Sequence, residues 1–223
     1  MAVNTKRKDC SYMAANSTNT HAPYPNQYRL DFIKHICEHG KKKFENFEPH
    51  VIESNDTVQI IEWSNKNGSF EYRIRFVFDI NTGNMFVSGD LGSAVFQFTK
   101  KARLEEISRY SDFNYFQEKM QCTTDITEYD SNYARLQLEE NLGLENDINE
   151  PDIQTLIHEI MQETDQYDGH PIYSDYVIDK LKDYDEDYWE WLYGIGVLPH
   201  RRIILWWEAL HEIRARLEKG EQQ

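Results

Sequence analysis

The first closely spaced group of zinc-binding residue types in the chain is His35, Cys37 and His39. On a helix, His35 and His39 share a face that Cys37 does not share. No second cluster of cysteine and histidine lies nearby in the sequence. The pattern therefore predicts a buried Cys37 and two surface histidines, with no metal and no cofactor.

A glycine-rich run at Ser88–Ser93 has the composition of a phosphate-binding loop. Such a loop opens a helix, so that free N–H groups converge on the anion. Here the run is followed by Ala94–Phe98, which has the composition of a strand. We therefore expect a hairpin bend, in which Asp90 bonds to backbone.

Acid–base chemistry could involve Asp168-Gly169-His170, or pairs within the acidic run at 183–187. Catalytic carboxylates converge from different elements onto one partner, which a contiguous run does not do. The sequence has no nucleophile elbow, no His-Glu-x-x-His, no Walker lysine and no Cys-x-x-Cys. We expect no catalytic residues, and a metal-dependent hydrolase or nucleotide-handling enzyme is an alternative.

Charge is the most uneven property of the chain, whose formal net charge is −15. Residues 111–199 carry 4 basic and 22 acidic side chains, a net of −18, whereas residues 1–110 have a net of +2 and residues 200–223 a net of +1. A surface with this charge repels nucleic acid and anionic membranes and attracts basic proteins. We therefore expect a basic protein partner, with no direct binding of nucleic acid or membrane.

Large aromatic residues interrupt the acidic tract most densely at 183–191. Aromatic side chains can anchor an interface while surrounding acids steer a basic partner towards it. The residues expected to bind the partner are Asp165, Asp168, Asp175, Asp179, Asp183, Tyr184, Asp185, Glu186, Asp187, Tyr188, Glu190 and Trp191.

Helical spacing separates the aromatic residues of this tract into core and surface. Trp189, Leu192 and Tyr193 fit one helical face and are expected in the core. Tyr184, Tyr188 and Trp191 are then the exposed ones. Nearer the C-terminus, the residues expected in the core are Trp206, Leu210 and Ile213.

The elements that must hold these residues change in character near Thr99. Before it, the apolar spacing over residues 27–47 predicts an amphipathic helix that Gly40 ends or interrupts. Strand signals follow at Val58–Trp63, Phe70–Phe78, Met85–Ser88 and Ala94–Phe98. They predict a four-stranded antiparallel meander with the helix on one face.

After Thr99 the apolar period becomes helical. Short helices are expected at Leu104–Ile107 and at Phe113–Met120, the second capped by Ser111 or Asp112. Longer helices are expected at 133–144, 152–164, 173–184 and 199–219. The fold class is therefore α+β, with an acidic helical C-terminal half.

Three regions are expected: a disordered leader at 1–25, an α+β subdomain at 26–110 and an acidic helical subdomain at 111–223. The leader lacks the apolar segment of a secretory signal. The longest apolar run near the C-terminus, Ile203–Trp207, is too short to span a membrane. The three cysteines are odd in number and far apart, unlike a secreted disulfide framework. We expect a cytoplasmic protein.

Two segments resemble uncharacterised bacteriophage and prophage proteins. One is Phe78–Phe96, centred on Phe86-Val87-Ser88-Gly89-Asp90-Leu91-Gly92, and the other runs from Tyr193-Gly194-Ile195-Gly196 through Trp206-Trp207-Glu208-Ala209-Leu210. The resemblance covers about half of the chain and brings no catalytic residues. Small acidic phage proteins include DNA mimics and anti-CRISPR proteins, which present carboxylates where a host defence protein binds phosphates.

The resemblance and the acidic tract together imply a phage-encoded, non-enzymatic inhibitor in the cytoplasm of a bacterial host. By acidic DNA mimicry it would bind a basic, nucleic-acid-binding surface of a host defence complex such as a CRISPR effector. An acidic phage assembly or scaffold protein, which would self-associate, is a second alternative. A homodimer is compatible with each of these readings.

Overall fold

The structure of the chain is a computed structural model, and it describes residues 25–110, 112–123, 125–143, 150–167 and 169–220. The predicted leader, residues 1–25, lies outside the described residues except for Pro25, where the first helix begins. None of the helices in the described part of the chain is both long and apolar enough to cross a membrane.

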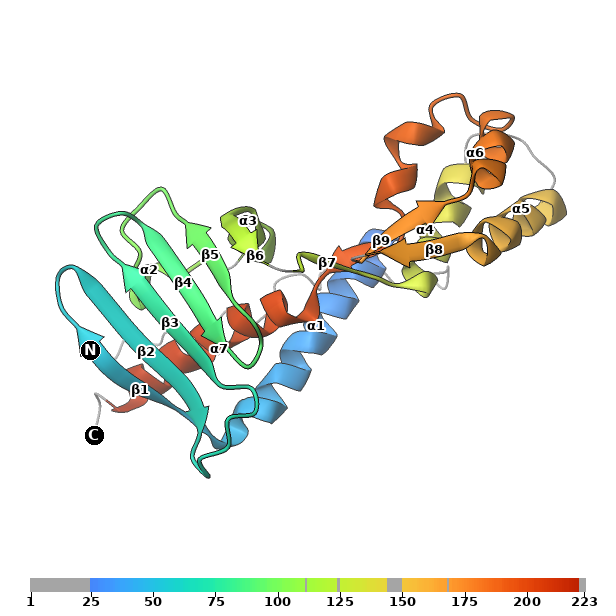
Figure 1. Cartoon of the computed structure of the whole chain (residues 1–223). Coiled ribbons are helices and arrows are strands. Elements are labelled where there is room, and N and C mark those ends of the chain that lie inside the picture. Colours follow the sequence, from blue (N-terminus) through green and yellow to red (C-terminus); the bar gives the residue numbers. More distant parts are fainter. Residues whose placement is uncertain (1–24, 111, 124, 144–149, 168, 221–223) are drawn as a thin grey trace, which may run out of the picture. The chain divides into compact units, whose positions relative to one another are not determined.

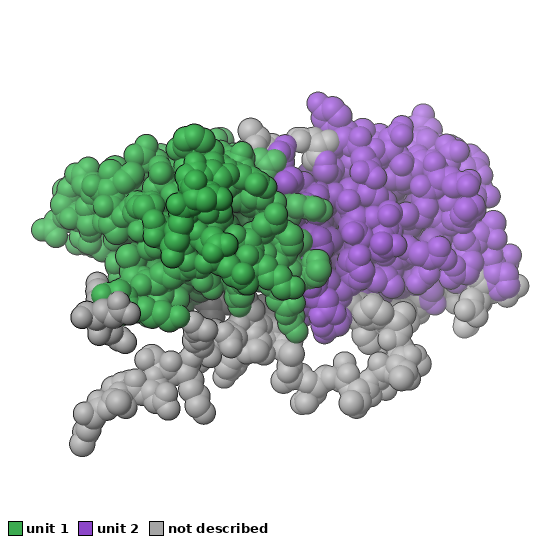
Figure 2. Space-filling view, turned by 90° about the horizontal axis from the view of Figure 1, so that it is seen from below, with its two compact units in different colours: residues 1–18, 33–124, 201–223 green, residues 19–32, 125–200 purple. Residues whose placement is uncertain are grey.

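The chain forms two compact units, which Figure 2 distinguishes by colour. Unit 1 contains residues 1–18, 33–124 and 201–223, and unit 2 contains residues 19–32 and 125–200. The helix α1 (Pro25–Lys43) contributes its first residues to unit 2 and the rest to unit 1. The units thus interleave along the sequence and do not coincide with the predicted regions 26–110 and 111–223.

Unit 1 is built on an antiparallel sheet of six strands, in the order β1-β2-β3-β4-β5-β6 (Figure 1). Its strands are β1 (Phe47–Ser54), β2 (Val58–Asn65), β3 (Ile74–Asp79), β4 (Asn84–Gly89), β5 (Ala94–Gln97) and β6 (Met120–Thr123). Its other elements are the 3-10 helix η2 (Phe44–Asn46) and the helices α2 (Leu104–Ile107), α3 (Phe113–Glu118) and α7 (Arg201–Gly220). The predicted α+β class, with an N-terminal helix and an antiparallel sheet, is confirmed.

The period-two pattern of the sheet residues creates one apolar face for the helices. In β3, Ile74, Phe76 and Phe78 are fully buried, while Arg75 between them is exposed. The ring of Trp206 in α7 lies 6.4 Å from that of Phe96 in β5. The residues of α7 predicted in the core are all fully buried, as expected, namely Trp206, Leu210 and Ile213.

The sheet has two strands more than predicted, and both are edge strands. Edge strands often carry charged residues, proline and bulges, which weaken the strand pattern in a sequence. All residues of β1 from Val51 onward are exposed, and the strand contains Pro49. At the other edge Met120, which was predicted to end a helix, begins β6. The helix before it is shorter, with Asp112 as its N-cap, as predicted.

Gly40 lies within α1 and does not end it, contrary to the prediction. A Cβ atom at this position would lie 3.0 Å from Cδ2 of Leu205 in α7. Glycine therefore permits close approach of the two helices, and its helix-breaking tendency is offset by packing. The helix continues to Lys43 and passes into η2.

The strand β3 begins at Ile74, later than predicted, because the residues before it form an irregular loop. In this loop Tyr72 has a φ of 58°, in the left-handed region. Oδ2 of Asp90 accepts a hydrogen bond from the backbone N of Tyr72 at 2.8 Å. The glycine-rich run itself bends the chain between β4 and β5, as predicted, with Gly89 and Gly92 at φ values of 139° and 93°.

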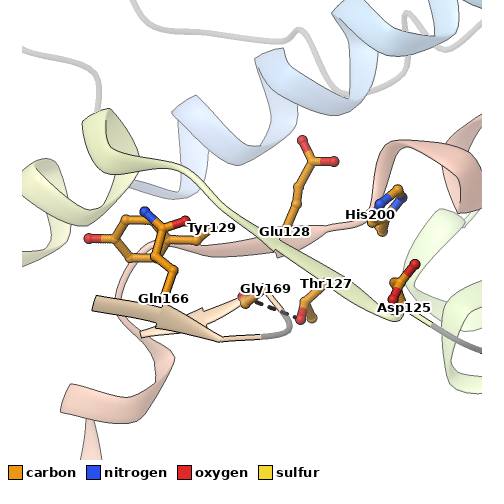
Figure 3. Close-up of a pocket in the computed structure, with 7 residues that line it drawn as sticks. All are labelled: Asp125, Thr127, Glu128, Tyr129, Gln166, Gly169 and His200. Atoms are coloured by element: carbon orange, nitrogen blue, oxygen red, sulfur yellow. Dashed lines mark hydrogen bonds between the residues drawn. The ribbon is translucent and has the colours of Figure 1, made fainter. Parts of the chain in front are cut away.

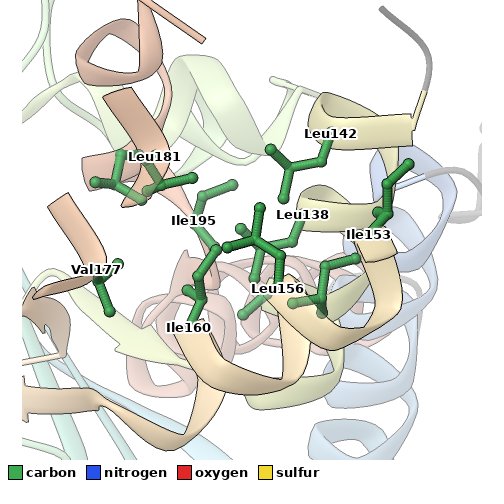
Figure 4. Close-up of a cluster of buried hydrophobic side chains, with 11 residues drawn as sticks. Leu138, Leu142, Ile153, Leu156, Ile160, Val177, Leu181 and Ile195 are labelled. Carbon is green, nitrogen blue, oxygen red and sulfur yellow. The ribbon is translucent and has the colours of Figure 1, made fainter. Parts of the chain in front are cut away.

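Unit 2 packs the helices α4 (Ser131–Gly143), α5 (Glu150–Gln162) and α6 (Asp175–Lys182) around one cluster of buried apolar side chains (Figure 4). The cluster contains Ala134, Leu138, Leu142, Ile153, Leu156, Ile157, Ile160, Val177, Leu181, Leu192 and Ile195. These residues recur at helical spacing in the sequence, which explains why all three helices were predicted.

The second half of the chain also contains short strands, so the prediction that it is wholly helical is wrong. Strand β7 (Thr127–Tyr129) pairs with β10 (Val197–Pro199), and β8 (Thr164–Tyr167) pairs with β9 (His170–Tyr173). Strands of three or four residues are too short to show a period-two pattern. The 3-10 helices η3 (Tyr188–Glu190) and η4 (Leu192–Gly194) lie between α6 and β10.

Candidate functional site

The acidic tract of the sequence falls almost entirely into unit 2. This unit contains 21 acidic and 4 basic residues, a net charge of −17, whereas unit 1 has 18 and 20, a net of +2. Of the acids predicted to bind a partner, those with exposed side chains are Asp165, Asp175, Asp179, Asp183, Glu186, Asp187 and Glu190. Asp168 lies outside the described residues. The exposed acids concentrate on α6 and in the segment that follows it.

Helix α6 carries a row of three carboxylates. The hydroxyl of Ser174 caps its N-terminus by accepting a hydrogen bond from the backbone N of Val177 at 3.4 Å. Asp175, Asp179 and the C-cap residue Asp183 are four residues apart, so they lie along one side of the helix. Asp175, in the first turn, is stabilised by the positive end of the helix dipole.

Helix α6 also carries two lysines, of which one pairs with an acid of this row and the other with an acid of α5. Nζ of Lys182 lies 2.9 Å from Oδ1 of Asp179. Lys180 pairs with Glu159 of α5, whose carboxylate also accepts a hydrogen bond from the hydroxyl of Tyr176 at 3.3 Å. The Lys180–Glu159 hydrogen bond raises the pKa of Lys180 and lowers the pKa of Glu159. These two lysines are outnumbered by the exposed acids of α6 and the segment after it, so acidic side chains remain in excess on this surface.

Asp185 holds the turn that follows α6. Its Oδ1 accepts a hydrogen bond from the backbone N of Asp187 at 2.8 Å, and its Oδ2 accepts one from Nε1 of Trp191 at 2.7 Å. Aspartate favours such turns because its short side chain reaches the backbone two residues further on. Both carboxylate oxygens are thus engaged inside unit 2, so Asp185 shapes the surface instead of offering a free carboxylate.

The aromatic residues after α6 have the opposite exposure to the one predicted. Tyr184, Tyr188 and Trp191 are partly buried and pack against the apolar cluster of unit 2. Trp189 and Tyr193, which were expected in the core, are 57% and 62% exposed. The prediction assumed an α-helical period, whereas this segment forms two 3-10 helices, which have three residues per turn.

The hairpin β8–β9 presents a second exposed surface in unit 2. In its register Asp165 lies opposite Ile172, and Tyr167 lies opposite His170. Residues opposite each other in antiparallel strands project from the same face, and this face continues through alternate residues. Tyr167 is 74% exposed and Ile172 51% exposed. The face therefore combines a carboxylate with large apolar side chains.

Tyr173 attaches this hairpin to the aromatic segment. Its hydroxyl donates a hydrogen bond to the carbonyl of Leu192 at 3.0 Å, and its ring centroid lies 6.4 Å from that of Tyr193. Burial raises the pKa of Tyr173, and the neighbouring Tyr129 and Tyr193 raise it further. Leu192 is fully buried, as predicted. The exposed Tyr193 is thus held on a rigid support.

A shallow hollow of about 350 Å³ lies beside the same hairpin (Figure 3). Its lining residues are Asp125, Thr127, Glu128, Tyr129, Gln166, Gly169 and His200. Oγ1 of Thr127 donates a hydrogen bond to the carbonyl of Gly169 at 3.5 Å and lies 3.1 Å from Nε2 of His170. When the hydroxyl proton points to Gly169, His170 donates to the hydroxyl oxygen, which is the reverse of the direction that a general base requires.

The metal ligands considered in the sequence do not come together in the structure. Cys37 is buried, and His35 and His39 are exposed, as the helical spacing predicts. Within the described ranges, no three histidine, cysteine, aspartate or glutamate residues are arranged to hold a metal ion.

Comparison of the chain with protein-family models, with curated proteins and with solved structures gives no match. The candidate site is therefore assigned from the residues of this chain alone.

The predicted partner-binding residues do not include several large exposed side chains of unit 2, namely Tyr167, Ile172, Tyr176, Trp189 and Tyr193. A signal for Trp189 is present in the sequence. The aspartate-rich run at 183–187 favours turns over helix, and this interrupts the helical phase before the tryptophan.

Proposed function

We propose that unit 2 binds a basic surface of a nucleic-acid-binding protein, and that its carboxylates take the positions of nucleic-acid phosphates there. The observation that supports this proposal is the combination of a net charge of −17 with large exposed aromatic side chains in the same unit. We name the exposed acidic and aromatic residues of α6, η3 and η4, and of the segment between α6 and η3, the acidic–aromatic surface. They are Asp175, Tyr176, Asp179, Asp183, Glu186, Asp187, Trp189, Glu190 and Tyr193.

The acids and aromatic residues of this surface have different tasks. Unpaired surface carboxylates steer a basic partner and set its orientation, but each contributes little net affinity. Affinity comes mainly from a few desolvated anchors, among which tryptophan, tyrosine and arginine are enriched. Trp189, which lies between the exposed Asp187 and Glu190, is the best placed anchor. Arginine on the partner suits this arrangement, since guanidinium groups pair with carboxylates and stack on aromatic rings.

The same proposal includes the biological setting that the sequence resemblance implies. The chain would be a phage-encoded inhibitor, and its partner a host defence complex such as a CRISPR effector. Inhibition would need no chemistry, because an occupied basic groove cannot receive nucleic acid. Both the phage origin and the defence complex follow from the resemblance alone.

The hydrolase and scaffold alternatives lead to different experiments. A metal-dependent enzyme would gain thermal stability with magnesium, manganese or zinc, through preferential binding of the metal to the folded state. A scaffold would form large assemblies in sedimentation.

The proposal is tested by capturing partners from bacterial lysate on the immobilised chain. Phosphate-like contacts depend on salt, so capture should fall steeply between about 50 mM and about 200 mM salt. Duplex DNA added to the complex should release the captured protein, because both ligands use one surface. A captured protein that resists both salt and DNA would contradict the proposal.

A further inference from the structure

The sheet of unit 1 carries an uncharged row of side chains on its outer face, opposite to the face that packs on α7. In the strand register Ile60 lies opposite Val77, Val77 opposite Phe86, Phe86 opposite Val95, and Val95 opposite Cys122. Directly opposed residues of antiparallel strands project from the same face. The row is therefore uncharged from β2 to β6, and on β1 it ends at the exposed Glu53, which lies opposite Ile60.

These side chains are accessible in the structure. Phe86 is 41% exposed and Cys122 is exposed, while Ile60, Val77 and Val95 are partly exposed. The solvent face of an antiparallel sheet is normally polar, which gives the usual alternation along each strand. A continuous apolar row on such a face is typical of a surface that another protein covers.

Polar residues flank the row on both sides. One flanking row contains His50, Glu62, Arg75 and Ser88, which follow one another across β1 to β4. The other contains the polar residues Asp79, Asn84 and Gln97 across β3 to β5, and the apolar Val58 at its end on β2. On β3, the cation Arg75 and the anion Asp79 thus lie at equal distances in sequence on either side of Val77.

We propose that this face docks onto the same face of a second copy of the chain, with the two-fold axis along the apolar row. The proposal concerns unit 1 and is independent of the function proposed for unit 2. Such an axis places each residue of the row opposite its own counterpart. It also places Arg75 opposite Asp79 of the second copy, and Asp79 opposite its Arg75. On β4 it places Ser88 opposite Asn84, so polar groups meet as well.

This charge pattern is what favours a second copy over another occupant. A two-fold interface must be self-complementary, and the opposite charges on either side of Val77 satisfy that condition on the central strand β3. From strand spacing and rise, the face measures roughly 600 Å² per copy, which is near the lower limit for a specific interface. The dimer should therefore dissociate on dilution in the micromolar range.

The test is sedimentation of the full chain at increasing concentration, with variants of the face. Phe86→Glu should weaken the dimer at least tenfold, because it places a charge in the row. Arg75→Asp and Asp79→Arg should each weaken it, because each brings like charges together across the interface. The double variant Arg75→Asp/Asp79→Arg should restore the dimer, since the exchange recreates both pairs. Circular dichroism establishes that each variant is folded.

Cys122 provides an independent readout of the same geometry. Packed sheets lie about 10 Å apart, so two Cys122 side chains near the axis are within reach of a bismaleimide reagent. Crosslinking should persist in Cys10→Ser, whose site lies outside the described residues, and disappear in Cys122→Ser. A chain that is monomeric at every concentration would overturn the proposal. So would a dimer that Phe86→Glu leaves unchanged, or one that the charge exchange does not restore.

Discussion

The indole Nε1 of Trp191 donates a hydrogen bond to Oδ2 of Asp185 at 2.7 Å. Trp191 also packs against the apolar cluster of unit 2, so the bond connects the turn after α6 to the core. Asp187 is fixed by the same carboxylate, through its backbone N. The exposed Trp189 lies in sequence between Asp187 and Trp191, both of which are hydrogen-bonded to Asp185. The carboxylate of Asp185, which is partly buried, therefore helps to define the position of Trp189.

Replacing Asp185 with alanine should destabilise unit 2. The change leaves a partly buried indole N–H without its acceptor and removes a hydrogen bond to a charged group, which costs about 1–3 kcal/mol of unfolding free energy. Asp183→Ala is the matched control. Its unfolding free energy should stay within about 0.5 kcal/mol of that of the natural chain, because Asp183 is exposed. Urea denaturation measures the unfolding free energy of each variant. Equal values for Asp185→Ala and Asp183→Ala would contradict the role assigned to Asp185.

Trp189→Ala should separate binding from folding. The side chain is 57% exposed, so the unfolding free energy should change by less than about 1 kcal/mol, while partner capture should fall at least about tenfold. Trp206→Ala removes a fully buried indole and should cost about 3–5 kcal/mol. Melting curves and capture assays on the two variants should therefore give opposite patterns. Full capture by Trp189→Ala would exclude this residue as an anchor.

His211 should make unit 1 less stable in mild acid. Burial lowers its pKa, which outweighs the opposing effect of hydrogen bonds with the backbone of Trp207 and Tyr110. Nδ1–H donates to the carbonyl of Trp207 at 2.8 Å, which fixes the tautomer of the ring, while burial favours its neutral form. The unfolded chain then binds the proton more tightly than the folded chain does. Stability should be constant well above about pH 6.5 and should fall as the pH drops below it.

The variant His211→Gln tests this pH dependence. It removes the titrating group, so the difference in melting temperature between the natural chain and the variant should shrink from about pH 7.5 to about pH 5.5. A difference that stays constant over this range would show that His211 does not titrate differently in the two states.

The elements that could be predicted from the sequence are those with long and clean periodicity. The helix α7 and the strands β2 to β5 each bury one regular face, and three of the residues that locate these faces are Trp206, Phe76 and Phe96. The short strands β7 to β10 and the edge strands β1 and β6 could not be predicted in this way. The pairs β5–β6 and β7–β10 join segments distant in the sequence, which local spacing does not record. The strands β1, β8 and β9 lie in local hairpins, but they are exposed or short and show no clear alternation.

Most of the exposed acids of the candidate site could be predicted from the sequence, but its exposed aromatic residues could not. Surface acids could be recognised one by one, because charged side chains are rarely buried. The exposure of Trp189 and Tyr193 depends on the helical phase, and the turn held by Asp185 shifts that phase. A single side-chain hydrogen bond therefore decides which aromatic residues face solvent.

Binding of a basic, DNA-binding partner by the acidic–aromatic surface, as proposed, can be tested by a matched charge reversal. The test variant is Glu186→Lys/Asp187→Lys/Glu190→Lys in unit 2, and the control is Glu45→Lys/Glu71→Lys/Glu118→Lys in unit 1. All six side chains are exposed, and both variants change the net charge of the chain equally.

Capture of a DNA-releasable protein from bacterial lysate is compared for the two variants at equal salt concentration. The unit 2 variant should lose capture while the control retains it, and both should melt close to the temperature of the natural chain. Full capture by the unit 2 variant, or equal loss by both, would contradict the claim.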